Sequence, residues 1–458
     1  MKRMAGLISI TPVWTLVLVL CLGAVASAAT KEVMVDVKCT TGKPVPVALT
    51  MEEVREVIGV DFPANWDSLR VVDASGKEIP FQIDDVDLSN TVSKRDELAF
   101  LAKGPCKIVV KDSAAEKPSF PNQLNVAPGE KGNIAISTLD GKFVVQVTNM
   151  GTVDVLKYNG AEHKYVKDLG MIRYAGFPYS TYWYDKDLGK HEEKTTFEEP
   201  LRVVKLTVLP NAPVRATVVV QTASDLFPGL RQFLVTSVYA TGDIRVSNRI
   251  VTAGYSDLTK LFTVANAVMA DFEDAVHMLP MFRYLDWAEE LGVAPADYWK
   301  SHDAVMNVDG RPYVVFADTR GPKPPWWGAS YLFASAERWR TNFSPKAGVG
   351  VAEILLTIPE VSKDLVERLK GQGWHLEGEW RTGYFRWIAA EIIDVRKKHG
   401  ITIDINPDMS EGDWPLHMIP GNSMEHLNYY VVYEAKDRVD AIRFLEARHA
   451  ELASVALK

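Results

Sequence analysis

Short segments in which apolar and polar residues alternate make up most of this chain. Residues 31–39 and 44–49 alternate in this way. A period of two places successive side chains on opposite faces of a strand, so both segments predict β-strands. Residues 52–58 follow a helical spacing instead. Residues 31–58 are therefore predicted to contain two strands followed by one helical insert.

Turn residues divide the next part of the chain. Residues 69–72 lead through a Ser-Gly turn into residues 79–83, which predicts a β-hairpin. Several short strands at this spacing favour a small β-sandwich domain over residues 29–110. Residues 111–133 are rich in Lys, Ser, Pro, Asn and Glu and have almost no apolar periodicity, so we predict a linker there.

The middle of the chain has the strongest strand pattern. Strands are predicted at residues 201–209, 214–221, 232–239 and 243–251. Their short connections imply antiparallel neighbours. We therefore predict a mainly β fold, in which the N-terminal β-sandwich is followed by a larger antiparallel β-supersandwich over residues 134–458, with a few peripheral helices.

Apart from residues 52–58, helical patterns lie in the second half of the chain. They fall at residues 283–291, 361–370 and 387–399, and after Asp437. Asp437 is a suitable N-cap for the last helix. That helix has an apolar stripe made of Val439, Ile442, Leu445 and Leu452.

The predicted strand at residues 243–251 has two different faces. One face is apolar and carries Ile244, Val246 and Ile250. The other face is polar and carries Arg245, Ser247 and Arg249. A sheet face with two arginines is a candidate for binding an anionic ligand.

The N-terminus has the layout of a signal peptide. Lys2 and Arg3 precede an apolar run at residues 13–25, and small residues follow up to Ala28. We expect cleavage after Ala28, and a secreted or periplasmic mature protein with no membrane anchor. The alternative is a lipid anchor on Cys21.

The net charge and the cysteine content limit the kinds of partner and the redox state that we expect. The formal net charge is −8 and both signs are mixed along the chain, which argues against nucleic-acid binding. Removal of residues 1–28 leaves Cys39 and Cys106 in an oxidising compartment, so they either form a disulfide or remain as two buried thiols.

Two stretches resemble a known family. Residues 69–101, LRVVDASGKEIPFQIDDVDLSNTVSKRDELAFL, resemble the N-terminal β-sandwich of bacterial polysaccharide-degrading proteins. Residues 208–250, which contain APVRATVVV and VYATGDIRVSNRI, are similar to galactose-mutarotase-like supersandwich proteins, notably the exo-acting rhamnogalacturonan lyases. The resemblance covers about a third of the chain and lies in strands rather than in catalytic residues, so it implies an architecture more than a reaction.

Aromatic and cationic residues supply candidates for substrate binding. Aromatic rings stack on the apolar faces of sugars, although they also cover the edges of sandwiches. The candidates are Tyr179, Tyr182, Trp183, Arg283, Arg320, Trp326, Trp327, Tyr331 and His426.

The chemistry expected from this set is β-elimination on an acidic, uronate-containing polysaccharide. A lyase must neutralise the substrate carboxylate, remove a proton and protonate the leaving oxygen. We nominate Arg249, His277 and Tyr284 for these three roles. A glycan-binding protein without catalysis is one alternative, and a glycoside hydrolase or epimerase with a His/Glu pair or two carboxylates is another.

No cofactor is expected from a sequence motif. The carboxylate-rich turn with Asp84, Asp85 and Asp87 is a candidate for calcium, although it lacks the spacing of a calcium loop. We assign no metal ligand from the sequence.

Overall fold

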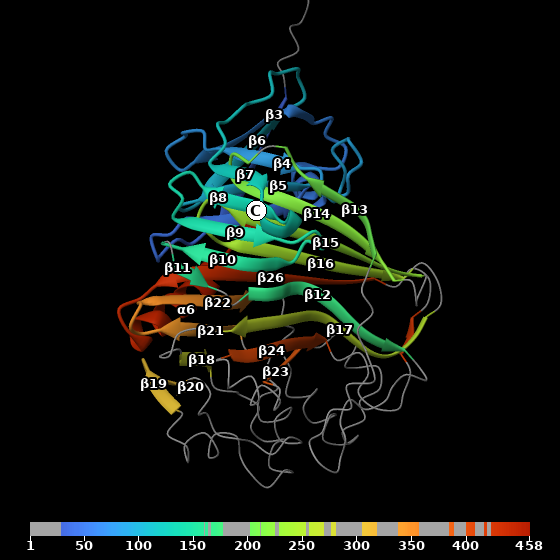
Figure 1. The fold of residues 1–458 in the computed structure, drawn as a ribbon. Helices are drawn as coiled ribbons and strands as arrows, with labels where there is room; N and C mark the ends of the chain where they lie inside the picture. Colours follow the sequence, from blue (N-terminus) through green and yellow to red (C-terminus); the bar gives the residue numbers. More distant parts are fainter. Residues whose placement is uncertain are drawn as a thin grey trace, which may run out of the picture.

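The structure is a computed structural model. It describes residues 29–159, 161–163, 166–176, 202–210, 212–224, 229–252, 256–269, 276–280, 305–317, 338–356, 384–388, 400–407, 416–418 and 423–458. The predicted signal peptide and the predicted helices at 283–291 and 361–370 lie outside these residues. The fold is mainly β, as predicted, and its sheets are antiparallel (Figure 1).

A ten-stranded sheet forms the centre of the molecule. Its strands, in spatial order, are β13 (Arg202–Val208), β14 (Arg215–Ala223), β15 (Leu230–Tyr239), β16 (Ile244–Thr252), β26 (Ser423–Glu434), β22 (Val349–Leu355), β21 (Trp339–Ser344), β18 (Val276–Pro280), β20 (Arg311–Ala317) and β19 (Val305–Val308). The first four are the four antiparallel strands predicted from the sequence. Strand β26 then inserts next to β16, so the sheet combines distant parts of the chain.

Two five-stranded sheets form the layer in front of it in Figure 1. The first has the order β11 (Ala161–His163), β10 (Val153–Tyr158), β9 (Phe143–Val147), β8 (Ile134–Thr138) and β7 (Leu124–Pro128). The second has the order β12 (Val166–Gly176), β17 (Ser256–Met269), β24 (Gly400–Pro407) and β23 (Tyr384–Ile388), with β25 (Leu416–Met418) paired to β17. Strand β10 contacts β12, which brings the two sheets together.

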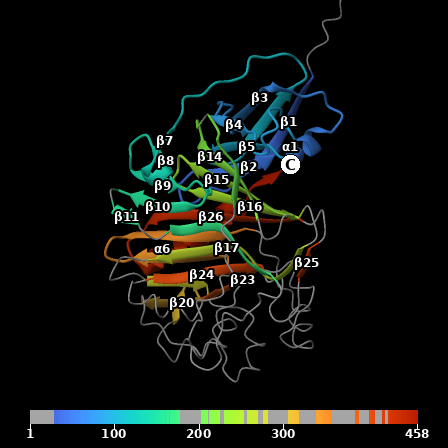
Figure 2. The same ribbon diagram turned by 45° about the vertical axis from the view of Figure 1, so that its right-hand side comes forward.

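Two smaller sheets from the N-terminal part lie at one end of the molecule (Figure 2). One has the order β27 (Ala456–Leu457), β1 (Thr30–Asp36), β6 (Cys106–Lys111) and β3 (Asn65–Asp73). The other has the order β2 (Val45–Thr50), β5 (Glu97–Ala102) and β4 (Phe81–Asp84). Because β27 pairs with β1, the two ends of the described chain share one sheet.

The helices begin at the caps that the sequence provides. Helix α1 (Met51–Ile58) has Thr50 as N-cap and a capping box with Glu53. Helix α6 (Arg438–Leu452) has Asp437 as N-cap, as predicted, and buries Ile442 and the other apolar residues of its stripe against the main core. A 3-10 turn at Glu130–Gly132 adds to these. Within the described part of the chain, neither helix is long and apolar enough to span a membrane.

Three local predictions differ from the structure. Strand β3 pairs with the segment before β4 through the bridge between Val72 and Glu78, and β3 and β4 themselves lie in different sheets. Pro80, just before β4, has no N–H with which to continue the pairing. The predicted linker at 111–133 contains strand β7. Residues 387 and 388 belong to β23 rather than to a helix. The division of the chain into two domains stays a prediction.

Both cysteines that remain after the predicted cleavage are free thiols. Cys106 is buried in β6, and burial raises the pKa of its thiol to about 12. The half-buried Cys39 donates from Sγ to the Lys43 carbonyl at 3.4 Å. The disulfide alternative is therefore not realised here.

Candidate functional site

The ten-stranded sheet has two faces with different chemistry. Antiparallel partners that lie directly opposite each other share a face. We call the side that carries Asn248 and Asn428 the amide face, and the side that carries Arg245 and Arg249 the arginine face. The alternation predicted for residues 243–251 is the alternation that separates them.

One half of the amide face is an apolar core. Residues such as Val218, Leu234 and Val246 pack against Phe143 and Val145 of the first five-stranded sheet. This packing accounts for the apolar side that the sequence predicted for β16.

The other half of the amide face is polar, although it belongs to the same strands. Thr222, Gln232 and Asn248 follow one another across β14, β15 and β16, and each is at most 3% exposed. The Thr222 hydroxyl donates to the Gln232 Oε1 at 3.2 Å, and the Gln232 Nε2 donates to the Asn248 Oδ1 at 2.9 Å. Buried polar groups are retained when they are hydrogen-bonded, as they are here.

A buried carboxylate continues this polar half. Glu353 on β22 is 2% exposed, and its Oε1 accepts from the Asn428 Nδ2 at 3.2 Å. The same Nδ2 lies 3.3 Å from the Tyr430 hydroxyl, to which it donates. The row therefore offers amide, hydroxyl and carboxylate groups on one sheet surface.

The strand register adds three ionisable positions to the amide face. Position 426 is a histidine directly opposite Asn248. Position 340 is an arginine directly opposite Glu353, and position 277 is a histidine opposite Asn342. Histidine is a residue type used in proton transfer, and arginine is one used in binding anionic substrates.

The arginine face is covered by the N-terminal sheets. The Arg215 Nε donates to the Asp84 Oδ2 at 2.7 Å, and its Nη2 donates to the Glu97 Oε2 at 2.8 Å. The Arg245 Nη1 donates to both oxygens of Glu97, at 2.8 and 2.9 Å. All four side chains are buried, so β4 and β5 are joined to the central sheet by a buried ionic network.

The network holds Glu97 in its charged form. Burial alone acts to raise the pKa of Glu97, but the guanidinium groups of Arg245 and Arg215 outweigh it, and the pKa is lowered. The prediction that this arginine-bearing face is open for a ligand is therefore wrong at Arg245, because carboxylates of the chain itself neutralise it.

The strand register places two of the nominated catalytic positions, 249 and 277, on different faces of the sheet. Arg249 is half-buried on the arginine face, with its guanidinium 4.4 Å from the centre of the Phe233 ring. By register, position 277 belongs to the amide face. The backbone of the sheet therefore lies between positions 249 and 277, and the role of Tyr284 remains a prediction.

Most of the other nominated residues lie outside the described part of the chain. These are Tyr179, Tyr182, Trp183, Arg283, Tyr284, Arg320, Trp326, Trp327 and Tyr331. Their roles remain predictions.

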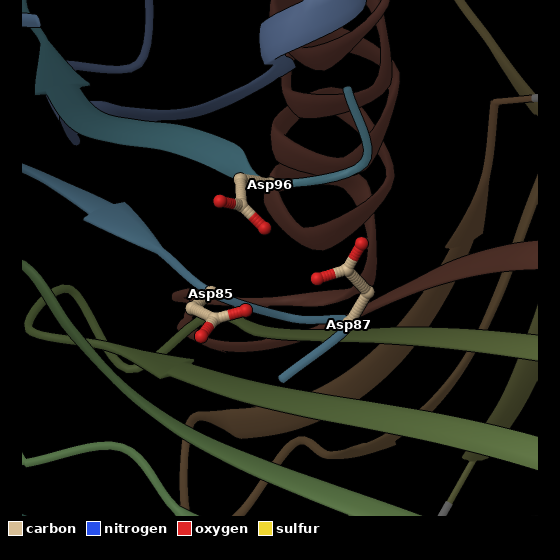
Figure 3. A group of neighbouring side chains, drawn as sticks. All are labelled: Asp85, Asp87 and Asp96. Carbon is tan, nitrogen blue, oxygen red and sulfur yellow. The ribbon is translucent and has the colours of Figure 1, made fainter. Parts of the chain in front are cut away.

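Three carboxylates form the candidate cation site. Oxygens of Asp85, Asp87 and Asp96 lie within 4.8 Å of one another (Figure 3), in the one group of this kind among the residues that the structure describes. Asp84, which the sequence placed in this set, is bound to Arg215 instead. Three carboxylate oxygens suit a hard cation such as Ca²⁺, while Asp96 already accepts from the Ser93 N–H and hydroxyl.

Sequence reasoning missed the polar row of the amide face. Gln232, Asn248 and Asn428 are each isolated polar residues in a strand pattern. A signal was present in β16, where Asn248 interrupts the apolar side between Val246 and Ile250. Their alignment across strands depends on the pairing of β16 with β26, which the sequence pattern does not specify.

Comparisons with known proteins place the chain in no family. No protein-family description and no curated protein matches it. Among solved structures, a galactose 1-epimerase from Lactobacillus acidophilus is 10% identical, with 69% of this chain and 100% of that chain covered and a TM-score of 0.35. A galactose mutarotase related enzyme from the same species is 9% identical, with 67% of this chain and 99% of that chain covered and a TM-score of 0.31.

A third solved structure is of another kind. A TPR-domain containing protein from Parabacteroides distasonis is 9% identical, with 89% of this chain and 55% of that chain covered and a TM-score of 0.33. These structures do not test the lyase part of the resemblance. TM-scores this low leave the function of this chain to be argued from its own residues.

Proposed function

We propose that this protein is a secreted, carbohydrate-active enzyme that binds a saccharide on the polar half of the amide face. The observation that carries the proposal is a pair of buried hydrogen bonds on this face, from Gln232 to Asn248 and from Asn428 to Glu353. A face built for packing alone would continue the apolar pattern of Val218 and its neighbours. Amides and carboxylates both match the hydroxyl groups of sugars, which donate and accept.

The reaction we propose first is β-elimination on a uronate-containing polysaccharide. It needs a cation for the substrate carboxylate. Arg249 lies on the opposite face, so this role passes to Arg340, which is opposite Glu353 in the register. His277 keeps its proposed role as the base, and Tyr284 as the acid.

A second candidate is an epimerase or mutarotase-type reaction. It is favoured by the buried carboxylate of Glu353, whose partner Asn428 is two residues from His426 in β26. A carboxylate and a histidine on one face are the general base and acid that a proton transfer to and from a sugar requires.

Two arginines on opposite faces of one sheet provide a matched test. Wild-type protein, Arg340→Ala and Arg249→Ala would be incubated with pectic, algal and glycosaminoglycan substrates, and unsaturated uronate would be followed by ultraviolet absorbance. We expect unsaturated products, with turnover lowered on the order of 100-fold in Arg340→Ala because stabilisation of developing charge is lost. Arg249→Ala should retain activity.

Other outcomes would change the proposal in defined ways. An equal loss in Arg249→Ala alone would move the site to the arginine face. Interconversion of sugar anomers without unsaturated products would favour the epimerase. Binding without any product would leave a glycan-binding protein.

A further inference from the structure

A pocket of about 380 Å³ lies at the end of the sandwich, where turns of two layers meet. It is lined by the β8–β9 turn, by the end of β10 and by the β15–β16 turn, which includes Thr241. Its volume is in the range of small-molecule sites. We call it the turn pocket.

The turn pocket is distinct from the polar half of the amide face. Thr241 precedes β16 and Asn248 lies well inside that strand. Seven residues of nearly extended chain separate them, which corresponds to roughly 20 Å. A ligand at one place would not occupy the other unless it were a polymer.

The pocket offers apolar surface that is held in place. Leu139 in the β8–β9 turn is 61% exposed, and it is the one leucine that is largely exposed among the residues whose burial the structure describes. The ring of Tyr158 lies 4.9 Å from the Lys142 Nζ, and the Tyr158 hydroxyl donates to Glu434 at 2.7 Å. The hydrogen bond of the hydroxyl to Glu434 and the contact with Lys142 therefore hold the Tyr158 ring in place.

The pocket also offers hydrogen-bonding groups of both kinds. Within the described part of the chain, the side-chain amide of Gln123 has no hydrogen-bond partner, so it has two donors and an acceptor to offer. The Thr241 hydroxyl donates to Asp243 at 2.6 Å, which leaves its oxygen as an acceptor. The exposed carboxylate of Asp140 accepts from Thr138 at 2.6 Å and retains further acceptor capacity.

The charges at the pocket compensate each other. The Lys142 Nζ is 3.3 Å from the Glu434 Oε1, and Asp140 adds a further negative charge beside it. No excess of positive charge is present among these residues to bind an anion. A ligand with an apolar ring face, hydroxyl edges and no charge fits this surface.

We propose that the turn pocket is an accessory binding site for a neutral sugar residue. The inference adds a second saccharide site to the proposed function and is independent of the reaction at the amide face. It is tested by isothermal titration calorimetry with three uncharged probes: galactopentaose, arabinopentaose and cellopentaose.

The variants separate this site from the rest of the molecule. Gln123→Ala combined with Leu139→Ser removes one polar and one apolar contact, and neither side chain has a partner in the fold that the change would leave unpaired. Val126→Ser is the matched control, because Val126 is 39% exposed on β7 and does not line the pocket. We expect at least one probe to bind the wild type, with a Kd about 10-fold weaker in the double variant and unchanged in the control.

Arg340→Ala distinguishes the two sites. It should lose uronate turnover and keep the affinity for the neutral probe. Absence of binding by all three probes would overturn the inference, and so would equal affinity of wild type and double variant. If the wild type bound a probe but produced no unsaturated uronate, the proposed reaction would be contradicted and the binding site in the turn pocket would be supported.

Discussion

The side chain of Glu97 bears most directly on how the N-terminal sheets are attached. It accepts from Arg215 and Arg245 at 2.8 Å, and all three side chains are buried. Glu97→Gln would remove the negative charge that pairs with the buried guanidinium groups of Arg215 and Arg245. Removing one partner of a buried pair costs about 3–5 kcal/mol, so we expect a loss of that order in the free energy of unfolding, measured by urea denaturation.

Glu52→Gln is the matched control for this change. The Glu52 carboxylate pairs with Lys94 at 2.9 Å, but both side chains are at least half exposed. Its loss should cost less than about 1 kcal/mol. Similar small effects from both substitutions would mean that the buried network does not hold the sheets together.

The Asp96 carboxyl is expected to make the stability of the folded protein depend on pH. Burial raises its pKa from 3.8 to about 6, so the folded state binds more protons than the unfolded state within that range. Its contribution to stability is therefore present at low pH and is lost as the pH rises through about 4 to 6. We expect Asp96→Asn to gain Tm relative to wild type over this range, measured by calorimetry.

The exposed Asp67 serves as the comparison for that experiment. Asp67→Asn should follow the wild-type pH profile. Parallel profiles for Asp96→Asn and wild type would show that folding does not raise the pKa of the Asp96 carboxyl.

At the residue scale, the sequence predicted the alternation of β16 and not its surroundings. Arg245 and Arg249 do share a polar face, as their spacing required. Glu97, which neutralises Arg245, lies 148 residues earlier in the chain. A local pattern carries no information on which distant segment covers a face. The two arginines of β16 therefore predict an anion-binding surface, whereas Arg245 forms an internal ion pair with Glu97.

Among the elements, helix α6 provides the clearest test. The Asp437 Oδ1 accepts from the Asp440 N–H at 2.9 Å. Asp437→Ala should lower the free energy of unfolding by about 1 kcal/mol, because a buried helix loses its N-cap. Lys436→Ala, on the neighbouring exposed residue, should have little effect, and an equal loss in both would argue against the cap.

Strands with short connections were predictable as elements. The four strands from β13 to β16 follow from alternation and turn residues, and so does their antiparallel order. The pairing of β16 with β26 and of β1 with β27 was not predictable, because it joins segments that are distant in the sequence through backbone groups that nearly all residues share. The polar row of the amide face depends on the first of these pairings.

At the scale of the whole molecule, the layered sheets agree with the predicted β-sandwich architecture. Export of the protein remains a proposal. Strand β1 begins at Thr30, so cleavage after Ala28 would leave every described strand intact. N-terminal sequencing of exported protein should begin near Ala29. Material that begins at Met1, or carries a lipid on Cys21, would contradict a soluble exported form.

The location of the saccharide tests the central claim most directly. Glu353→Gln keeps the shape of the side chain and removes its charge, so it should still bind the saccharide, and it should also slow turnover if Glu353 acts as the acid/base group of the epimerase candidate. A crystal structure of this variant soaked with an acidic oligosaccharide should show sugar density against Gln232, Asn248 and Asn428. Density confined to the arginine face, or none on the amide face at saturating ligand, would contradict it.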